Sequence, residues 1–217
     1  MIPRKSDVAE YNINKLRSLN CPVTRINAIH TGGSEARKAD SDVAKGLESR
    51  LLLARGAKVM LRTNLWMEAG LVNGSVGTIR DIVFEEDQGP PSLPIAVLVE
   101  FDGYTGPGIV SEEGFKVVPI TPVRHTWESK KGTCSRLQVP ICLAWAITMH
   151  KSQGLTLEKA VIDLGEREYA AGLSFVAISR VRSLRNSFER LQRVKTCKRL
   201  QERKLEERWL ISMIPST

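Results

Sequence analysis

Two stretches of the chain join an apolar run to side chains that bind phosphate. The first runs from Ala144 to Leu157 and the second from Ser174 to Arg182. Hydroxyl, imidazole and ammonium groups hold phosphate oxygens without reading base sequence. A guanidinium beside a transferring phosphate stabilises the charge that develops there. The first stretch therefore suits a nucleic-acid backbone and the second a nucleotide. The polar candidates of the first stretch are Thr148, His150, Lys151 and Ser152.

Apolar segments on either side must position the first stretch. The apolar residues 138–146 predict a buried segment that leads into the polar turn. Residues 155–159 are expected to begin a helix, which is followed by a buried strand over 160–164. Gly154 lies between them, where a residue without a side chain lets the backbone approach a ligand closely. His150 is not expected to bind a metal, because His30 and His125 are distant in sequence and no cysteine or carboxylate stands at ligand spacing.

The sequences of the two stretches are similar to the last two motifs of the petite integration frequency helicases, a RecD-like branch of the superfamily-one DNA helicases. The first matches A-W-A-x-T-x-H-K-S-Q-G-x-T-L over 144–157, and the second matches Y-V-A-L-S-R over 175–180. In such helicases ATP binds between two RecA-like domains, and the protein moves along single-stranded DNA as that cleft opens and closes. The resemblance implies that this chain is the second RecA-like domain with an insertion.

The same resemblance implies roles for single residues. Arg180 would be the arginine finger, and together with Gly154 it would contact ATP bound with Mg²⁺. A bare arginine after a helix is otherwise a solvated charge. No G-x-x-x-x-G-K-[ST] loop occurs in the 217 residues, so we expect ATP to be held mainly by an N-terminal RecA-like domain that the chain does not contain. Alone, the chain is expected to be inactive.

Residues 56–137 predict short strands separated by Gly, Asn, Asp and Pro, which is typical of a small barrel. The strands are expected at 58–62, 76–84, 95–101 and 115–120. The runs 56–64 and 70–77 resemble the family segment that leads into a Src-homology-three-like barrel. Asn73 and Gly74 within it are candidates for DNA contact, and equally an ordinary turn dipeptide. Tyr104 and Trp127 are aromatic candidates for base stacking, with burial as the alternative for Trp127.

The expected fold is α/β: a RecA-like, mainly parallel sheet with an inserted Src-homology-three-like β-barrel. We assign 1–55 to the first part of the second RecA-like domain, 56–137 to the barrel and 138–190 to the rest of the domain. A helix is expected over 4–20, a strand over 25–30, and a loop with a polar helix over 31–50. Residues 191–217 read as a charged C-terminal helix that either touches DNA or is solvated.

Composition limits the partners. The chain carries 32 Lys and Arg against 24 Asp and Glu, a formal charge of +8, which favours a polyanion or simply a basic soluble surface. Its four cysteines lack Cys-x-x-Cys spacing, which indicates reduced thiols in the nucleus or cytoplasm, with a mitochondrial form still open. No apolar run approaches the roughly 20 residues that span a bilayer, so no membrane partner is expected.

We therefore expect the C-terminal half of an ATP-dependent, 5′-to-3′ DNA helicase whose partners are single-stranded DNA and its own N-terminal RecA-like domain. The polarity comes from the resemblance alone. The alternative is a non-catalytic nucleic-acid-binding module that kept the fold and lost the motor. An upstream phosphate-binding loop in the gene would favour the helicase.

Overall fold

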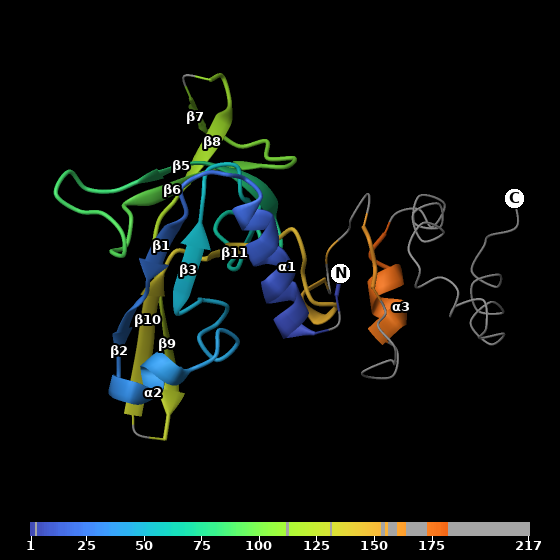
Figure 1. The fold of residues 1–217 in the computed structure, drawn as a ribbon. Helices are drawn as coiled ribbons and strands as arrows, with labels where there is room; N and C mark the ends of the chain where they lie inside the picture. Colours follow the sequence, from blue (N-terminus) through green and yellow to red (C-terminus); the bar gives the residue numbers. More distant parts are fainter. Residues whose placement is uncertain are drawn as a thin grey trace, which may run out of the picture. The chain divides into compact units, whose positions relative to one another are not determined.

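The computed structural model describes residues 1–2, 4–111, 113–130, 132–152, 155, 160–163 and 173–181. They divide into two units, one of Ala9–Ala146 and the other of Met1–Val8 with Ile147–Thr217. Figure 1 shows the larger unit as strands with one long helix beside them. In the described part of the chain, no helix is both long and apolar enough to cross a membrane.

Helix α1, Lys5–Arg17, confirms the helix predicted over 4–20 but is shorter at its end. Asp7 lies in the first turn, and Lys15 and Arg17 lie in the last, so charges of both signs match the helix dipole. Leu16 is 2% exposed and joins the core of the larger unit. The helix is thus held by one apolar stripe and by favourable end charges.

The largest sheet has six antiparallel strands in the order β11-β4-β5-β6-β8-β7. Buried and partly buried residues alternate along the first half of β5, and β6 is apolar except for Glu100, which fits strands with at least one buried face. The predicted strands at 58–62, 76–84, 95–101 and 115–120 are confirmed here, with ends shifted by a residue. The strands are β4 Lys58–Leu61, β5 Val76–Val83, β6 Ala96–Phe101, β7 Ile109–Val110, β8 Lys116–Ile120 and β11 Ile141–Leu143.

Two smaller antiparallel sheets complete this unit. In the first, β1 (Thr24–Asn27) pairs with β3 (Arg50–Leu53). In the second, β10 (Gly132–Gln138) lies between β2 (Ile29–Thr31) and β9 (Val123–Ser129). The single strand predicted over 25–30 is therefore wrong, because the chain leaves one sheet at Ala28 and enters another. The predicted polar helix of the 31–50 segment is confirmed as α2, Gly33–Lys38.

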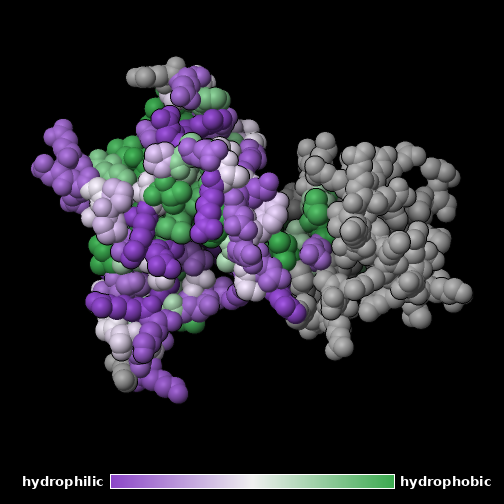
Figure 2. Space-filling view, viewed as in Figure 1, coloured by the Kyte–Doolittle hydropathy of each residue, from purple (hydrophilic) through white to green (hydrophobic). Residues whose placement is uncertain are grey.

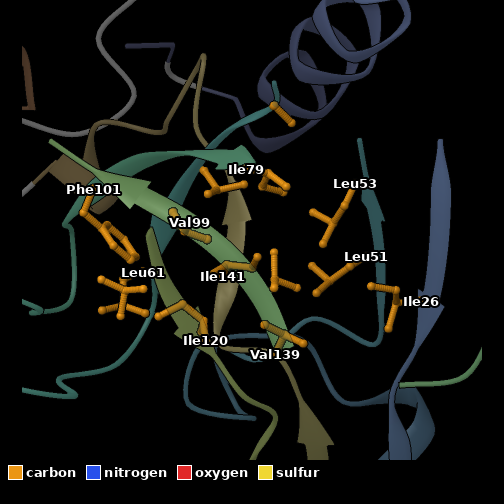
Figure 3. Close-up of a cluster of buried hydrophobic side chains, with 14 of the residues drawn as sticks. Ile26, Leu51, Leu53, Leu61, Ile79, Val99, Phe101, Ile120, Val139 and Ile141 are labelled. Atoms are coloured by element: carbon orange, nitrogen blue, oxygen red, sulfur yellow. The ribbon is translucent and has the colours of Figure 1, made fainter. Parts of the chain in front are cut away.

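The core lies between the β1-β3 pair and the six-stranded sheet. Figure 3 shows Ile26, Leu51 and Leu53 from the pair facing Ile79 and Ile141 from the larger sheet. All five side chains are at most 4% exposed. The surface around this core is mostly hydrophilic, with hydrophobic residues exposed in places (Figure 2). Burial of aliphatic side chains, each contributing about 1.5–3 kcal/mol, holds the two sheets together.

A buried arginine fastens α2 and the segment after it to the three-stranded sheet. Arg136 of β10 is fully buried, and its guanidinium donates to the carbonyl oxygens of Ala36 (3.0 Å), Ala39 (2.7 Å) and Leu47 (2.7 Å). His30 and His125 are its register partners on β2 and β9. The arginine thus satisfies three backbone acceptors that the fold turns away from water.

The described sheets differ from the predicted architecture. Every pair of named strands is antiparallel, whereas a mainly parallel sheet was expected. Among the described strands the six-stranded sheet stays open, so the inserted Src-homology-three-like barrel remains a prediction. Parallel pairing does occur in the smaller unit, where Ile2 forms a parallel bridge with Thr148. The predicted domain boundaries at 55/56, 137/138 and 190/191 stay predictions, and the C-terminal helix over 191–217 lies outside the described residues.

Candidate nucleic-acid and nucleotide site

Three extended segments of the smaller unit lie side by side and lead into the candidate turn. The Ile2 amide donates to the carbonyl of Ile147 (3.0 Å), and the Asp163 amide donates to the carbonyl of Met1 (2.9 Å). The Met1 nitrogen in turn donates to the carbonyl of Val161. This is the bonding pattern of parallel strands. The turn thus begins directly at the end of a parallel pair, which is where α/β folds place ligand sites.

The turn itself separates buried hydroxyls from accessible nitrogen groups. Thr148 is 5% exposed and Ser152 is fully buried, whereas His150 is exposed and Lys151 half-buried. The Ser152 hydroxyl donates to the carbonyl of Met149 at 2.6 Å, and the Thr148 hydroxyl accepts from the Lys151 amide at 3.4 Å. The three residues from His150 to Ser152 form a 3₁₀ turn, η1. The hydroxyls therefore shape the turn, and His150 and Lys151 are the groups it presents to a ligand.

An apolar cluster joins this turn to the helix that precedes Arg180. Met149 from the turn packs with Ala177 and Val181, and all three are buried. Helix α3, Leu173–Ile178, lies against η1. The two motifs predicted to bind phosphates therefore belong to one packed unit, although one ends at Leu157 and the other begins only at Ser174. Burial of small and flexible apolar side chains provides the contact.

Arg180 lies just beyond the C-terminal end of α3. Its Nε donates to the carbonyl of Val176 at 3.2 Å, and its Nη2 donates to the Ser179 hydroxyl at 3.1 Å. The side chain is half-buried. A cation is favourable at a helix C-terminus, because the last carbonyls have no partner within the helix. A guanidinium has five N–H donors, so these contacts leave capacity for a phosphate.

Asn73 and Gly74 form a tight turn before β5. The Ser75 amide donates to the carbonyl of Val72 at 2.9 Å, which closes the turn, and Gly74 has a φ of 103° that only glycine adopts without strain. The amide of Asn73 donates to Oδ1 of Asn64 at 2.8 Å, while its side chain is exposed. Asn73 and Gly74 therefore do form a turn. The exposed Asn73 side chain is still available for a contact with DNA.

Comparisons with known proteins support the resemblance seen in the motifs. The rat ATP-dependent DNA helicase PIF1 is 35% identical over 185 residues, which cover 83% of this chain and 25% of that protein. The crystal structure of the Candida albicans Pif1 helicase aligns with a TM-score of 0.65 at 29% identity, over 86% of this chain and 43% of that one. The chain belongs to the Pif1 helicase family. No protein-family model matches it.

A second solved Pif1 structure agrees. It concerns DNA unwinding at forked double-stranded DNA by two coordinating Pif1 helicases, and it aligns with a TM-score of 0.57 at 27% identity over 86% of this chain and 37% of that one. The chain spans about a quarter of the length of the rat relative. Its described fold is thus a portion of the Pif1 architecture.

One buried polar contact, in the segment that precedes the candidate turn in sequence, was not predicted from the sequence. Asn12 of α1 is 5% exposed and bonds to the segment that leads into the turn. Its Nδ2 donates to the carbonyl of Ala146 at 3.0 Å and, more weakly, to that of Leu143 at 3.4 Å, while its Oδ1 accepts from the Ala146 amide at 2.8 Å. The sequence indicated a helix here, and its resemblance to the family over 4–12 includes this asparagine, but neither identified Ala146 as the partner. Gly154, the remaining candidate, lies outside the described residues.

Proposed function

We propose that this chain supplies the part of a Pif1-type ATP-dependent DNA helicase that holds single-stranded DNA and presents an arginine to ATP. Its relatives are named ATP-dependent DNA helicases, and a helicase that unwinds a fork releases single strands. The observation that carries the proposal is the packing of the 148–152 turn against α3, which leads to Arg180. A 5′-to-3′ direction of movement is part of this proposal.

In this account His150 and Lys151 hold phosphate oxygens of the DNA. Both are accessible and both can donate hydrogen bonds, whereas the buried hydroxyls of Thr148 and Ser152 keep the turn in shape. Contacts of this kind do not depend on base sequence. Asn73 and Gly74 add a DNA contact through the exposed Asn73 side chain, which the turn at Gly74 presents. Movement along any sequence requires contacts with these properties.

Arg180 acts on the nucleotide. To reach a phosphate, its guanidinium exchanges the Val176 carbonyl for a phosphate oxygen, which is the stronger, charge-assisted partner. Magnesium and most of ATP are held by a second RecA-like domain, with Gly154 allowing the backbone of this chain to approach. The guanidinium then stabilises charge on the transferring phosphate, which in nucleotide hydrolases changes the rate by about 10³ to 10⁵.

The test joins this chain to the ATP-binding domain of a Pif1 relative and measures DNA-stimulated ATP hydrolysis. Arg180→Ala should lower turnover by about 10³ or more while DNA affinity stays unchanged. Arg180→Lys serves as the matched variant, because it keeps the charge but loses the planar fork. Unchanged turnover in Arg180→Ala would remove the finger role.

A second candidate function is a nucleic-acid-binding module without catalysis. The formal charge of +8 favours it, because attraction to a polyanion needs no nucleotide. The same joined protein separates the two functions. Hydrolysis by the unsubstituted joined protein supports the motor, whereas DNA binding without any hydrolysis supports the module.

A further inference from the structure

The connection between β4 and β5 ends in a small, well-ordered tip. The Trp66 amide donates to the carbonyl of Leu71 (3.1 Å), and the Leu71 amide donates back to the carbonyl of Trp66 (2.9 Å). A further bond runs from the Gly70 amide to the carbonyl of Met67 (3.1 Å). Leu71 is 3% exposed and belongs to the core, which anchors the tip. The backbone of the tip is therefore fixed before any partner binds.

The outer side of this tip is apolar. Leu65, Trp66 and Met67 are consecutive, and they are 43%, 44% and 67% exposed. Single exposed apolar residues need no explanation. Three in a row on a fixed tip form an apolar surface, and covering it with a partner lowers the free energy. An indole ring also offers a flat face for stacking. The tip therefore presents a preformed aromatic platform.

A hydrogen bond joins the tip to the turn at Asn73 and Gly74, the second candidate for DNA contact. Oδ1 of Asn64, two residues before Trp66, accepts from the amide of Asn73. No cation occurs from Asn64 to Glu68, and Glu68 itself is acidic. A phosphate would be repelled here, so a nucleic acid would meet this tip through its bases rather than its backbone.

We propose that Trp66 stacks on a base of the bound single strand, with Leu65 and Met67 beside it. The proposal rests on the proposed function and names the contact that the loop makes. The other aromatic candidates are engaged within the fold. The Tyr104 hydroxyl donates to the carbonyl of Pro107 at 2.7 Å, and the Trp127 ring lies 5.8 Å from the Arg136 guanidinium.

The experiment measures the affinity of the full chain for a fluorescent oligothymidylate by anisotropy at several salt concentrations. Trp66→Ala should weaken binding about 5- to 150-fold, the range of one lost base stack, and Trp66→Phe should lose less than about fivefold. Because stacking releases no counterions, the salt dependence should be the same for both variants and the unsubstituted chain. An abasic oligonucleotide should bind the unsubstituted chain and Trp66→Ala almost equally.

Two variants serve as controls. Val110→Ala removes apolar surface from another exposed residue, which is 70% exposed, and Trp127→Phe changes a tryptophan that the fold engages. Neither should alter affinity, and the circular dichroism melting curve of Trp66→Ala should match that of the unsubstituted chain.

Four outcomes overturn the proposal. An unchanged affinity in Trp66→Ala would exclude base stacking by Trp66 and leave the proposed function intact. An equal loss of affinity for normal and abasic DNA would exclude it in the same way. A dimer that dissociates in Trp66→Ala, with DNA affinity unchanged, makes the tip a protein interface. If the unsubstituted chain binds no DNA, the proposed function fails as well.

Discussion

Asn12 provides the sharpest test of how the fold prepares the candidate turn. Asn12→Ala removes the bonds of 2.8 and 3.0 Å to the amide and carbonyl of Ala146, together with the weaker 3.4 Å bond to Leu143. Because the asparagine is 5% exposed, water cannot readily replace it. Each buried group left without a partner costs about 1–3 kcal/mol, so two such groups predict a loss of about 2–6 kcal/mol.

The assay is urea unfolding followed by circular dichroism. The midpoint should fall while the slope with urea stays the same, since the surface exposed on unfolding is unchanged. Asn12→Asp keeps the acceptor for the Ala146 amide but sets a charge against the Ala146 carbonyl, so it should be no better than alanine. Asn14→Ala is the matched control, because Asn14 is exposed on the same helix. It should change stability by less than about 0.5 kcal/mol.

The result that refutes this reasoning is a loss in Asn12→Ala no larger than that in Asn14→Ala. The segment that leads into the DNA turn would then be held by packing alone. A loss of the expected size in Asn12→Ala, with DNA affinity reduced as well, would make Asn12 a positioning residue for the turn.

Three further predictions concern the larger unit. Arg136→Met removes the guanidinium from three backbone carbonyls, those of Ala36, Ala39 and Leu47, and should lower stability by about 2–3 kcal/mol, measured by urea unfolding. Gly77→Ala places a methyl 2.5 Å from a backbone oxygen of β6 and should destabilise by about 1–3 kcal/mol, whereas Gly89→Ala, with open space around it, should not. Burial and neighbouring cations lower the pKa values of His30 and His125, so the unfolded chain binds protons more readily. Stability should be constant above about pH 6.5 and fall as pH decreases from there through the folded pKa values, and replacing both histidines with glutamine should flatten that decline.

The strands of the six-stranded sheet could be predicted because their own residues decide them. Apolar and β-branched residues dominate 76–83 and 96–101, and glycine and proline mark the turn between them. The β9-β10 hairpin could not be found in the same way. Its strands carry Arg124, His125 and Arg136, and the burial of Arg136 depends on contacts with α2 and the segment after it, which the local sequence does not reveal. The sequence pattern also did not predict whether the strands pair in parallel or antiparallel, because the same pattern of apolar residues occurs in both kinds of sheet.

The candidate site was predicted by residue type but not by burial. The motif contains four polar residues, and nothing in their spacing separates the buried Ser152 from the exposed His150. The Asn12 contact was hidden for a different reason, since its partner Ala146 lies 134 residues away. Trp66 was also missed, because a tryptophan beside leucine and methionine is expected to be buried, whereas here the turn at Leu71 fixes it outward.

The central claim is that the chain holds single-stranded DNA by its phosphates through the 148–152 turn. The most direct measurement is the affinity for oligothymidylate as a function of salt for Lys151→Ala and for Lys130→Ala, an exposed lysine at the end of β9. We predict that Lys151→Ala weakens binding and reduces the slope of log affinity against log salt by about 0.7, the value of one lost phosphate contact, while Lys130→Ala changes neither. An identical slope in both variants and the unsubstituted chain would contradict the account.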